Sequence, residues 1–155
     1  MDTLMMIKQR VADMHLHSPR VNAVAASEDS ATEARVDEFC HGLGKQLGEE
    51  CELTRRIWLL SELRLPQLRA IAASEAAAAD LVIVSVHHGE DLPPELLSWI
   101  DLWLPHKRDQ RSLLLALFDP ISSGVSATLR ARLEEVARKA HMEFLAQSED
   151  APAPA

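Results

Sequence analysis

A β-branched, mostly apolar run, LVIVSV at residues 81–86, constrains the fold of this chain more than any other segment. The run is rich in β-branched residues, follows an alanine-rich stretch that ends at Asp80, and precedes two histidines and Gly89. Such a run is typical of an interior strand of a parallel sheet, which helices cover on both faces. A chain of 155 residues can bury one core of ordinary size, so we predict a single domain built around this strand.

Shorter apolar segments and amphipathic stretches alternate along the rest of the chain. The apolar segments predict strands at residues 21–26, 53–60, 113–118 and 142–146. The amphipathic stretches predict helices at residues 30–48, 66–79, 93–104 and 126–140. For the first helix, Asp29 or Ser30 is the expected N-cap, and Gly44 or Gly48 is the expected end.

Strands that alternate with helices predict a doubly wound parallel sheet, because each right-handed crossover places a helix on one face of that sheet. We therefore expect an α/β fold, a three-layer α/β/α sandwich whose five-stranded parallel sheet has the flavodoxin-like order 2-1-3-4-5. The flavodoxin-like α/β domain is expected to span residues 19–147.

Two terminal segments fall outside this predicted domain. Residues 1–18 predict a helical lead-in that ends at Pro19, since four apolar residues recur there at helical spacing: Leu4, Ile7, Val11 and Met14. Residues 148–155 are rich in proline and alanine with two acids, so we expect a disordered tail.

The charge balance excludes several classes of partner. The chain has 16 lysines and arginines against 24 acidic residues, for a net charge of −8. Such a balance argues against binding to nucleic acid and to anionic membranes, which both require basic surfaces. Two cysteines outside any CxxC motif, with no signal peptide and no membrane-spanning run, indicate a reduced, cytoplasmic protein.

The most favourable place for a ligand in such a sheet is the switch point, outside the carboxyl ends of strands one and three. The side chains expected there are Ser27, Glu28, Asp29, Ser85, His87 and His88. Two imidazoles and two carboxylates could bind a transition metal or exchange protons near neutral pH. They could equally be solvated or capping side chains of a loop. A phosphate cofactor such as FMN is not expected, because Glu28 and Asp29 would repel it, and we predict no cofactor.

The helix at residues 93–104 is apolar around much of its circumference, more than one buried stripe requires. Two interpretations stay open: the whole surface packs on the sheet, or part of it contacts a partner or a second copy of the chain. A short basic loop at residues 105–111 adjoins the helix, and we expect it to be solvated or to contact an anion or an acidic partner. The candidate contact residues are Leu96, Trp99, Ile100, Trp103, Lys107 and Arg108.

The stretches ADLVIVSVHHGEDLPPELLSWI and VARKAHMEFLAQSED, with the loop SEDS after the first strand, resemble the response-regulator receiver family over about residues 20–148. The resemblance implies that Glu28 and Asp29 correspond to the family's magnesium-binding acids. It places Ser85 where receivers carry the aspartate that accepts a phosphoryl group, and Gln147 near the place of their lysine. Without that nucleophile and counter-charge, aspartyl phosphorylation is not expected.

These observations lead to two functional hypotheses. The first is a non-catalytic regulatory or protein-interaction domain, resembling a degenerate receiver, that binds a protein partner or a second copy of itself. The alternative is an enzyme that binds a small ligand or a metal at the switch point. The sequence identifies no catalytic residue, so we favour the first hypothesis.

Overall fold

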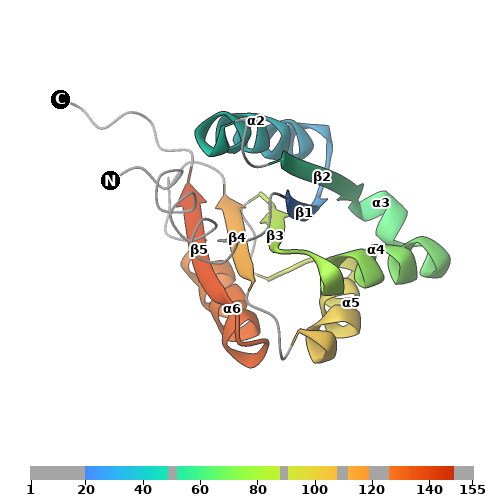
Figure 1. Ribbon diagram of the computed structural model, residues 1–155. Helices are drawn as coiled ribbons and strands as arrows, with labels where there is room; N and C mark the ends of the chain where they lie inside the picture. The colour runs from blue at the N-terminus through green and yellow to red at the C-terminus, as the bar shows by residue number, and fades with distance from the viewer. Residues whose placement is uncertain (1–19, 49–51, 88–90, 108–111, 119–125, 149–155) are drawn as a thin grey trace.

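The computed structural model describes residues 20–48, 52–87, 91–107, 112–118 and 126–148. They form a five-stranded sheet in which all neighbouring strands are parallel (Figure 1). The order β2-β1-β3-β4-β5 confirms the predicted flavodoxin-like arrangement. The strands are β1 (Arg20–Ser27), β2 (Glu52–Leu59), β3 (Leu81–Ser85), β4 (Leu113–Phe118) and β5 (Glu143–Ser148).

Helices connect the strands, and the four helices predicted between residues 30 and 140 are present. They are α2 (Ser30–Leu47), α4 (Pro66–Ala78), α5 (Pro94–Trp103) and α6 (Ser126–Lys139). Two short elements were not expected, α3 (Leu60–Leu63) and the 3₁₀ turn η1 (Leu104–His106). Because Glu62 Oε1 accepts a hydrogen bond from the Leu59 amide at 2.9 Å, the chain turns at Leu60 rather than extending the second strand through it.

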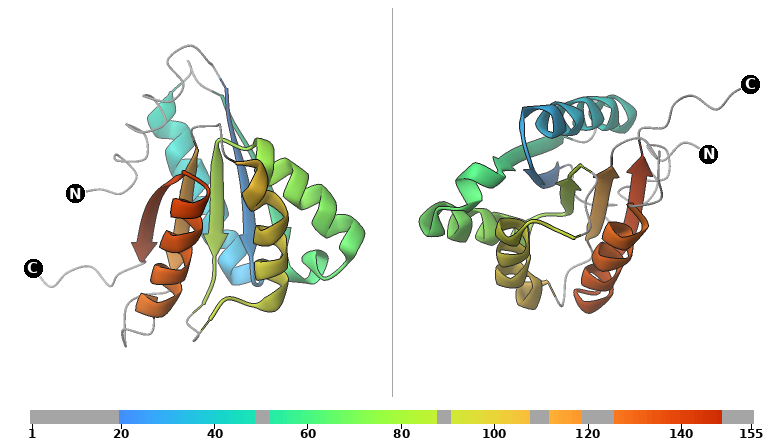
Figure 2. Two further views of the ribbon diagram at one scale, coloured as in Figure 1. Left: turned by 90° about the horizontal axis from the view of Figure 1, so that it is seen from below. Right: turned by 180° about the vertical axis from the view of Figure 1, so that it is seen from behind.

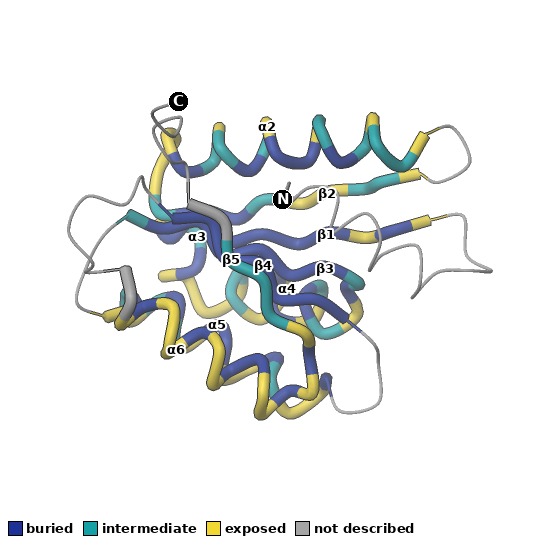
Figure 3. Tube along the Cα trace, turned by 90° about the vertical axis from the view of Figure 1, so that its left-hand side faces the viewer, coloured by how far each residue is buried: buried dark blue, intermediate teal, exposed yellow. Residues whose placement is uncertain are grey.

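The sheet separates two layers of helices (Figure 2). On one face α4, α5 and α6 pack together with the larger apolar core. On the other face α2 packs against β1, β2 and β3. All residues of β3 and β4 are buried, as expected for interior strands, whereas the edge strands β2 and β5 are partly exposed (Figure 3).

The ends of α2 follow its sequence signals. Asp29 is the N-cap: its carboxylate accepts the Thr32 amide, and the Thr32 hydroxyl accepts the Asp29 amide. Gly44 lies inside the helix, and the chain leaves it at Gly48, whose φ of 78° is a left-handed conformation that suits glycine.

The terminal predictions lie largely outside the described residues. The lead-in at residues 1–18 is not described, nor are residues 149–155 of the expected tail. Within the described ranges, no helix is long and apolar enough to cross a membrane.

Candidate functional site

The switch point lies where β1 and β3 end side by side. Ser27 and Ser85 are the last residues of these strands and are register partners across the parallel pair. Both residues are completely buried. The hydroxyl of Ser27 donates to the Trp58 carbonyl oxygen at 3.5 Å, and that of Ser85 donates to the Thr32 carbonyl oxygen at 3.0 Å. Both hydroxyls therefore bond inside the protein, and neither is available as an exposed nucleophile.

Charged groups cross the same switch point. His87 Nε2 lies 2.8 Å from Asp29 Oδ2, and the His87 amide donates to Glu28 Oε1 at 3.0 Å. The side chains of His87 and Asp29 are 36% and 50% exposed, so this pair faces solvent. These bonds connect the loop after β3 to the start of α2, which is the juxtaposition that the sequence predicts for Glu28, Asp29 and His87.

The Asp29 carboxylate has two sets of partners that stabilise its charge. The backbone hydrogen bond from Thr32 is the larger cause and His87 the second, and together they lower the pKa of Asp29 below its usual range. A capping carboxylate also interacts favourably with the positive end of the α2 dipole. Asp29 is thus both the cap of α2 and the partner of His87.

Replacing Asp29 by alanine is expected to lower the free energy of unfolding by about 1 kcal/mol, because the α2 cap is lost. The contribution should be present above the usual pKa of aspartate and disappear as the pH falls through the lowered value in the folded state. Urea denaturation at pH 7 and pH 3 measures both effects. Ser30→Ala is the matched control, since Ser30 lies one residue further along and is not the cap; equal losses in the two variants would contradict the assignment.

A metal at this switch point finds little support in the described residues, where no three His, Cys, Asp or Glu side chains are grouped as metal ligands. His88, the other histidine expected here, lies outside the described residues. The described part of the switch point can exchange a proton or bind a polar ligand through His87 and Asp29. Ser27 and Ser85 present no exposed hydroxyl beside them.

The predicted contact surface on α5 is wrong. Leu96, Trp99 and Trp103 have no exposed surface and Ile100 is 2% exposed, because all four pack into the core between α5 and the sheet. The two tryptophan rings lie against each other edge to face, with centroids 5.7 Å apart. The packing interpretation therefore accounts for these four residues. The large apolar side chain of α5 that is exposed to solvent is Leu102, which is 46% exposed.

The adjoining basic loop also differs from expectation. Lys107 is fully buried instead of solvated, and its Nζ donates to the Ala79 carbonyl oxygen at 2.5 Å. Burial lowers the pKa of Lys107 to about 8, an effect that the Asp80 carboxylate opposes. Lys107 therefore holds the end of η1 against the start of β3. Arg108 lies outside the described residues.

Asp80 organises the amino-terminal edge of the sheet, a role that the sequence did not reveal. Its amide donates to the Asn22 carbonyl oxygen, its Oδ2 accepts the Asn22 amide at 2.9 Å, and its carbonyl oxygen accepts the Leu113 amide. One residue thus joins β1, β3 and β4. An acid directly before a buried strand was the available signal, but its partners lie 58 and 33 residues away.

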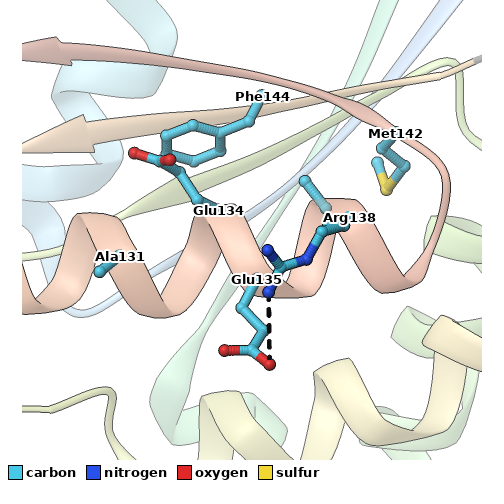
Figure 4. Close-up of a pocket in the computed structure, with 7 residues that line it drawn as sticks. Ala131, Glu134, Glu135, Arg138, Met142 and Phe144 are labelled. Atoms are coloured by element: carbon cyan, nitrogen blue, oxygen red, sulfur yellow. Dashed lines mark ion pairs between the residues drawn. The ribbon is translucent and has the colours of Figure 1, made fainter.

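Two hollows lie elsewhere on the surface. One of about 460 Å³ lies between α6 and β5, where Phe144 and Met142 form an apolar floor and Arg138 pairs with Glu135 at 3.6 Å (Figure 4). The other, about 510 Å³, lies between α2 and β2. It contains Cys40, whose thiol pKa burial raises to about 11, which makes it a poor nucleophile near neutral pH. Neither hollow adjoins the switch point.

The arrangement occurs in known structures, although the sequence gives no relative. The chain matches no protein-family model and no curated protein sequence. Among solved structures, it is similar to the Trp repressor binding protein from Bacillus subtilis, with a TM-score of 0.55 and 10% identity over 86% of this chain and 88% of that chain. At this identity the likeness shows the flavodoxin-like fold and nothing of function.

Proposed function

We propose that this chain is a non-catalytic regulatory or protein-interaction domain, related in layout to response-regulator receivers but lacking their phosphorylation chemistry. It acts in the cytoplasm by binding a protein partner, a second copy of the chain included. Partner recognition uses surfaces other than the buried side of α5.

The observation that carries this proposal is that Ser85 is buried and its hydroxyl is hydrogen-bonded inside the protein. This residue holds the position that the receiver resemblance assigns to the phosphoryl acceptor, and it is a buried serine whose hydroxyl donates to the backbone of α2. Aspartyl phosphorylation needs an exposed carboxylate there as nucleophile. At the same switch point, Asp29 and His87 bond to each other. A domain that lacks a phosphoryl acceptor at this position acts by binding a partner rather than by becoming phosphorylated.

One observation favours the alternative, a small-ligand site at the switch point. The His87–Asp29 pair is partly exposed at the carboxyl ends of β1 and β3, where doubly wound folds bind their ligands. A ligand there would exchange hydrogen bonds with this pair. The buried Ser27 and Ser85 would remain behind it.

Acetyl phosphate and beryllofluoride with Mg²⁺ are expected neither to label the protein nor to change its tryptophan fluorescence or melting temperature. Intact-mass spectrometry and thermal denaturation measure the two responses. Stoichiometric labelling of an aspartate would overturn the proposal. A rise in melting temperature without labelling, if lost in His87→Ala, would favour the ligand-binding alternative; Arg130→Ala, at an exposed ion pair on α6, is the matched control.

A further inference from the structure

The solvent-facing side of α4 carries no charge. Its exposed residues are all neutral: Pro66, Gln67, Ala70, Ile71, Ser74 and Ala78. The two charged side chains of the helix bond within the protein instead. Arg69 Nη1 donates to the Leu63 carbonyl oxygen at 3.3 Å. Glu75 Oε1 accepts the Trp58 indole N–H at 2.8 Å. Each of the other long helices, α2, α5 and α6, exposes at least one charged residue, so the neutral face distinguishes α4 from them.

The large apolar side chains that are exposed among the described residues lie on the same part of the surface. Leu65, the N-cap residue of α4, and Ile71 within the helix are 52% and 49% exposed. The third, Leu102, is 46% exposed on α5, which packs beside α4 (Figure 1). Interface centres are depleted of charge, and covering apolar side chains removes their area from water. Both properties favour a contact at α4.

Four of the exposed residues form a line along α4, which we call the α4 seam: Gln67, Ile71, Ser74 and Ala78. They follow one another by four, three and four positions, the spacing that keeps side chains on one side of a helix. An antiparallel second copy, related by a two-fold axis between Ile71 and Ser74, brings Ile71 of one copy against Ser74 of the other. It also brings Gln67 against Ala78. Each longer side chain then meets a shorter one, so the seam is complementary to itself.

The charges favour an antiparallel second copy as the occupant. The chain has a net charge of −8, so two copies repel each other least where neutral faces meet. α4 has no acid in its first turn, no base in its last turn and no side-chain hydrogen bond at its N-cap. An antiparallel neighbour compensates both ends of this helix dipole, because it sets each positive end beside a negative one. The same arrangement brings Arg64, directly before one α4, toward Asp80, just after the other.

We propose that the chain forms a two-fold symmetric dimer through the α4 seam, with the two helices antiparallel. This assignment rests on the proposed function, since it names the partner that the binding domain recognises and the surface that it uses. A pair of 13-residue helices buries less than the roughly 1,600 Å² of a standard interface. We therefore expect a weak dimer, with a dissociation constant on the order of 10–100 µM.

Sedimentation velocity of the full chain, from concentrations far below to far above this dissociation constant, measures the dimer. Ile71→Glu and Ser74→Lys each place an unmatched charge in the α4 seam, and each is expected to weaken self-association at least about tenfold. Ala131→Glu and Thr128→Lys change the net charge in the same way at exposed positions of α6. These two controls should leave the dissociation constant within about twofold of the native value.

A mixture of the two seam variants tests the antiparallel register. In an equimolar mixture of Ile71→Glu and Ser74→Lys proteins, the introduced carboxylate of one copy meets the introduced ammonium group of the other. We expect this mixture to dimerise more tightly than either variant alone. A general loss of folding would not recover on mixing, and circular dichroism of each variant checks this directly.

Three results would overturn the dimer: a monomer at every concentration, a dimer that neither seam variant weakens, and a weakened dimer that the mixture does not restore. The first would leave the proposed function intact with a different partner. The second would place the contact on another face, and the third would exclude the antiparallel arrangement. Stoichiometric labelling of an aspartate by acetyl phosphate would instead overturn the proposed function, in monomer and dimer alike, so the two failures are distinguishable.

Discussion

Replacing Trp103 by alanine is expected to lower the free energy of unfolding by about 3–5 kcal/mol. Trp103 has no exposed surface and packs edge to face against Trp99 in the core beneath α5. Its removal forfeits the burial of a large aromatic side chain and leaves a cavity that neighbours fixed in a packed core cannot fill. Urea denaturation followed by circular dichroism measures the loss.

The adjacent residue supplies the control for this prediction. Leu102 lies on the same helix but is 46% exposed, so Leu102→Ala should change the free energy of unfolding by less than about 0.5 kcal/mol. Trp103→Phe keeps an aromatic ring in the core and should cost far less than the alanine variant. If Trp103→Ala left stability intact and instead dissociated an oligomer, the residue would belong to an interface and the burial argument would fail.

The second large effect concerns Lys107 and the pH. In the folded protein burial lowers the pKa of Lys107 to about 8, whereas in the unfolded chain it keeps the ordinary lysine value. Above pH 8 the unfolded state therefore binds more protons at this site than the folded state, so stability rises with pH. The gain is complete once the unfolded lysine has also lost its proton.

Relative to Lys107→Met, the native protein is expected to gain about 2–3 kcal/mol of stability between pH 7 and pH 10. Methionine is apolar and similar in size, so the variant lacks the titration but retains much of the packing. The difference between the two proteins cancels the opposing effect of Cys40, whose raised pKa lowers the free energy of unfolding as the pH rises above 9. The chain contains no tyrosine, which keeps this pH range free of phenol titration.

Lys139 provides the matched lysine for this measurement. It lies at the end of α6 with its side chain 63% exposed, so Lys139→Met removes a lysine without removing a buried ammonium group. A flat difference between Lys107→Met and the native protein over this pH range would mean that water reaches the Lys107 ammonium group. The role of Lys107 as a buried clamp between η1 and Ala79 would then be wrong.

The candidate site was predicted only in part. The sequence brings Glu28, Asp29 and His87 together correctly, because the topological rule for parallel sheets depends only on strand order. It does not reveal that the hydroxyls of Ser27 and Ser85 are used internally. The partner of Ser85 is a backbone oxygen 53 residues away in the chain, which no local pattern encodes.

The order of strands and the type of every major helix were determined by the sequence alone. The local signals were the hydrophobic period, the helix cap at Asp29 and the helix end at Gly48. They were enough to predict a five-stranded parallel sheet in the order 2-1-3-4-5. The tertiary structure alone decided which apolar and charged residues are accessible. For Trp103 the sequence left packing and partner contact both open, and it placed Lys107 in a solvated loop. Both residues are buried, because burial depends on which distant segments pack against a residue.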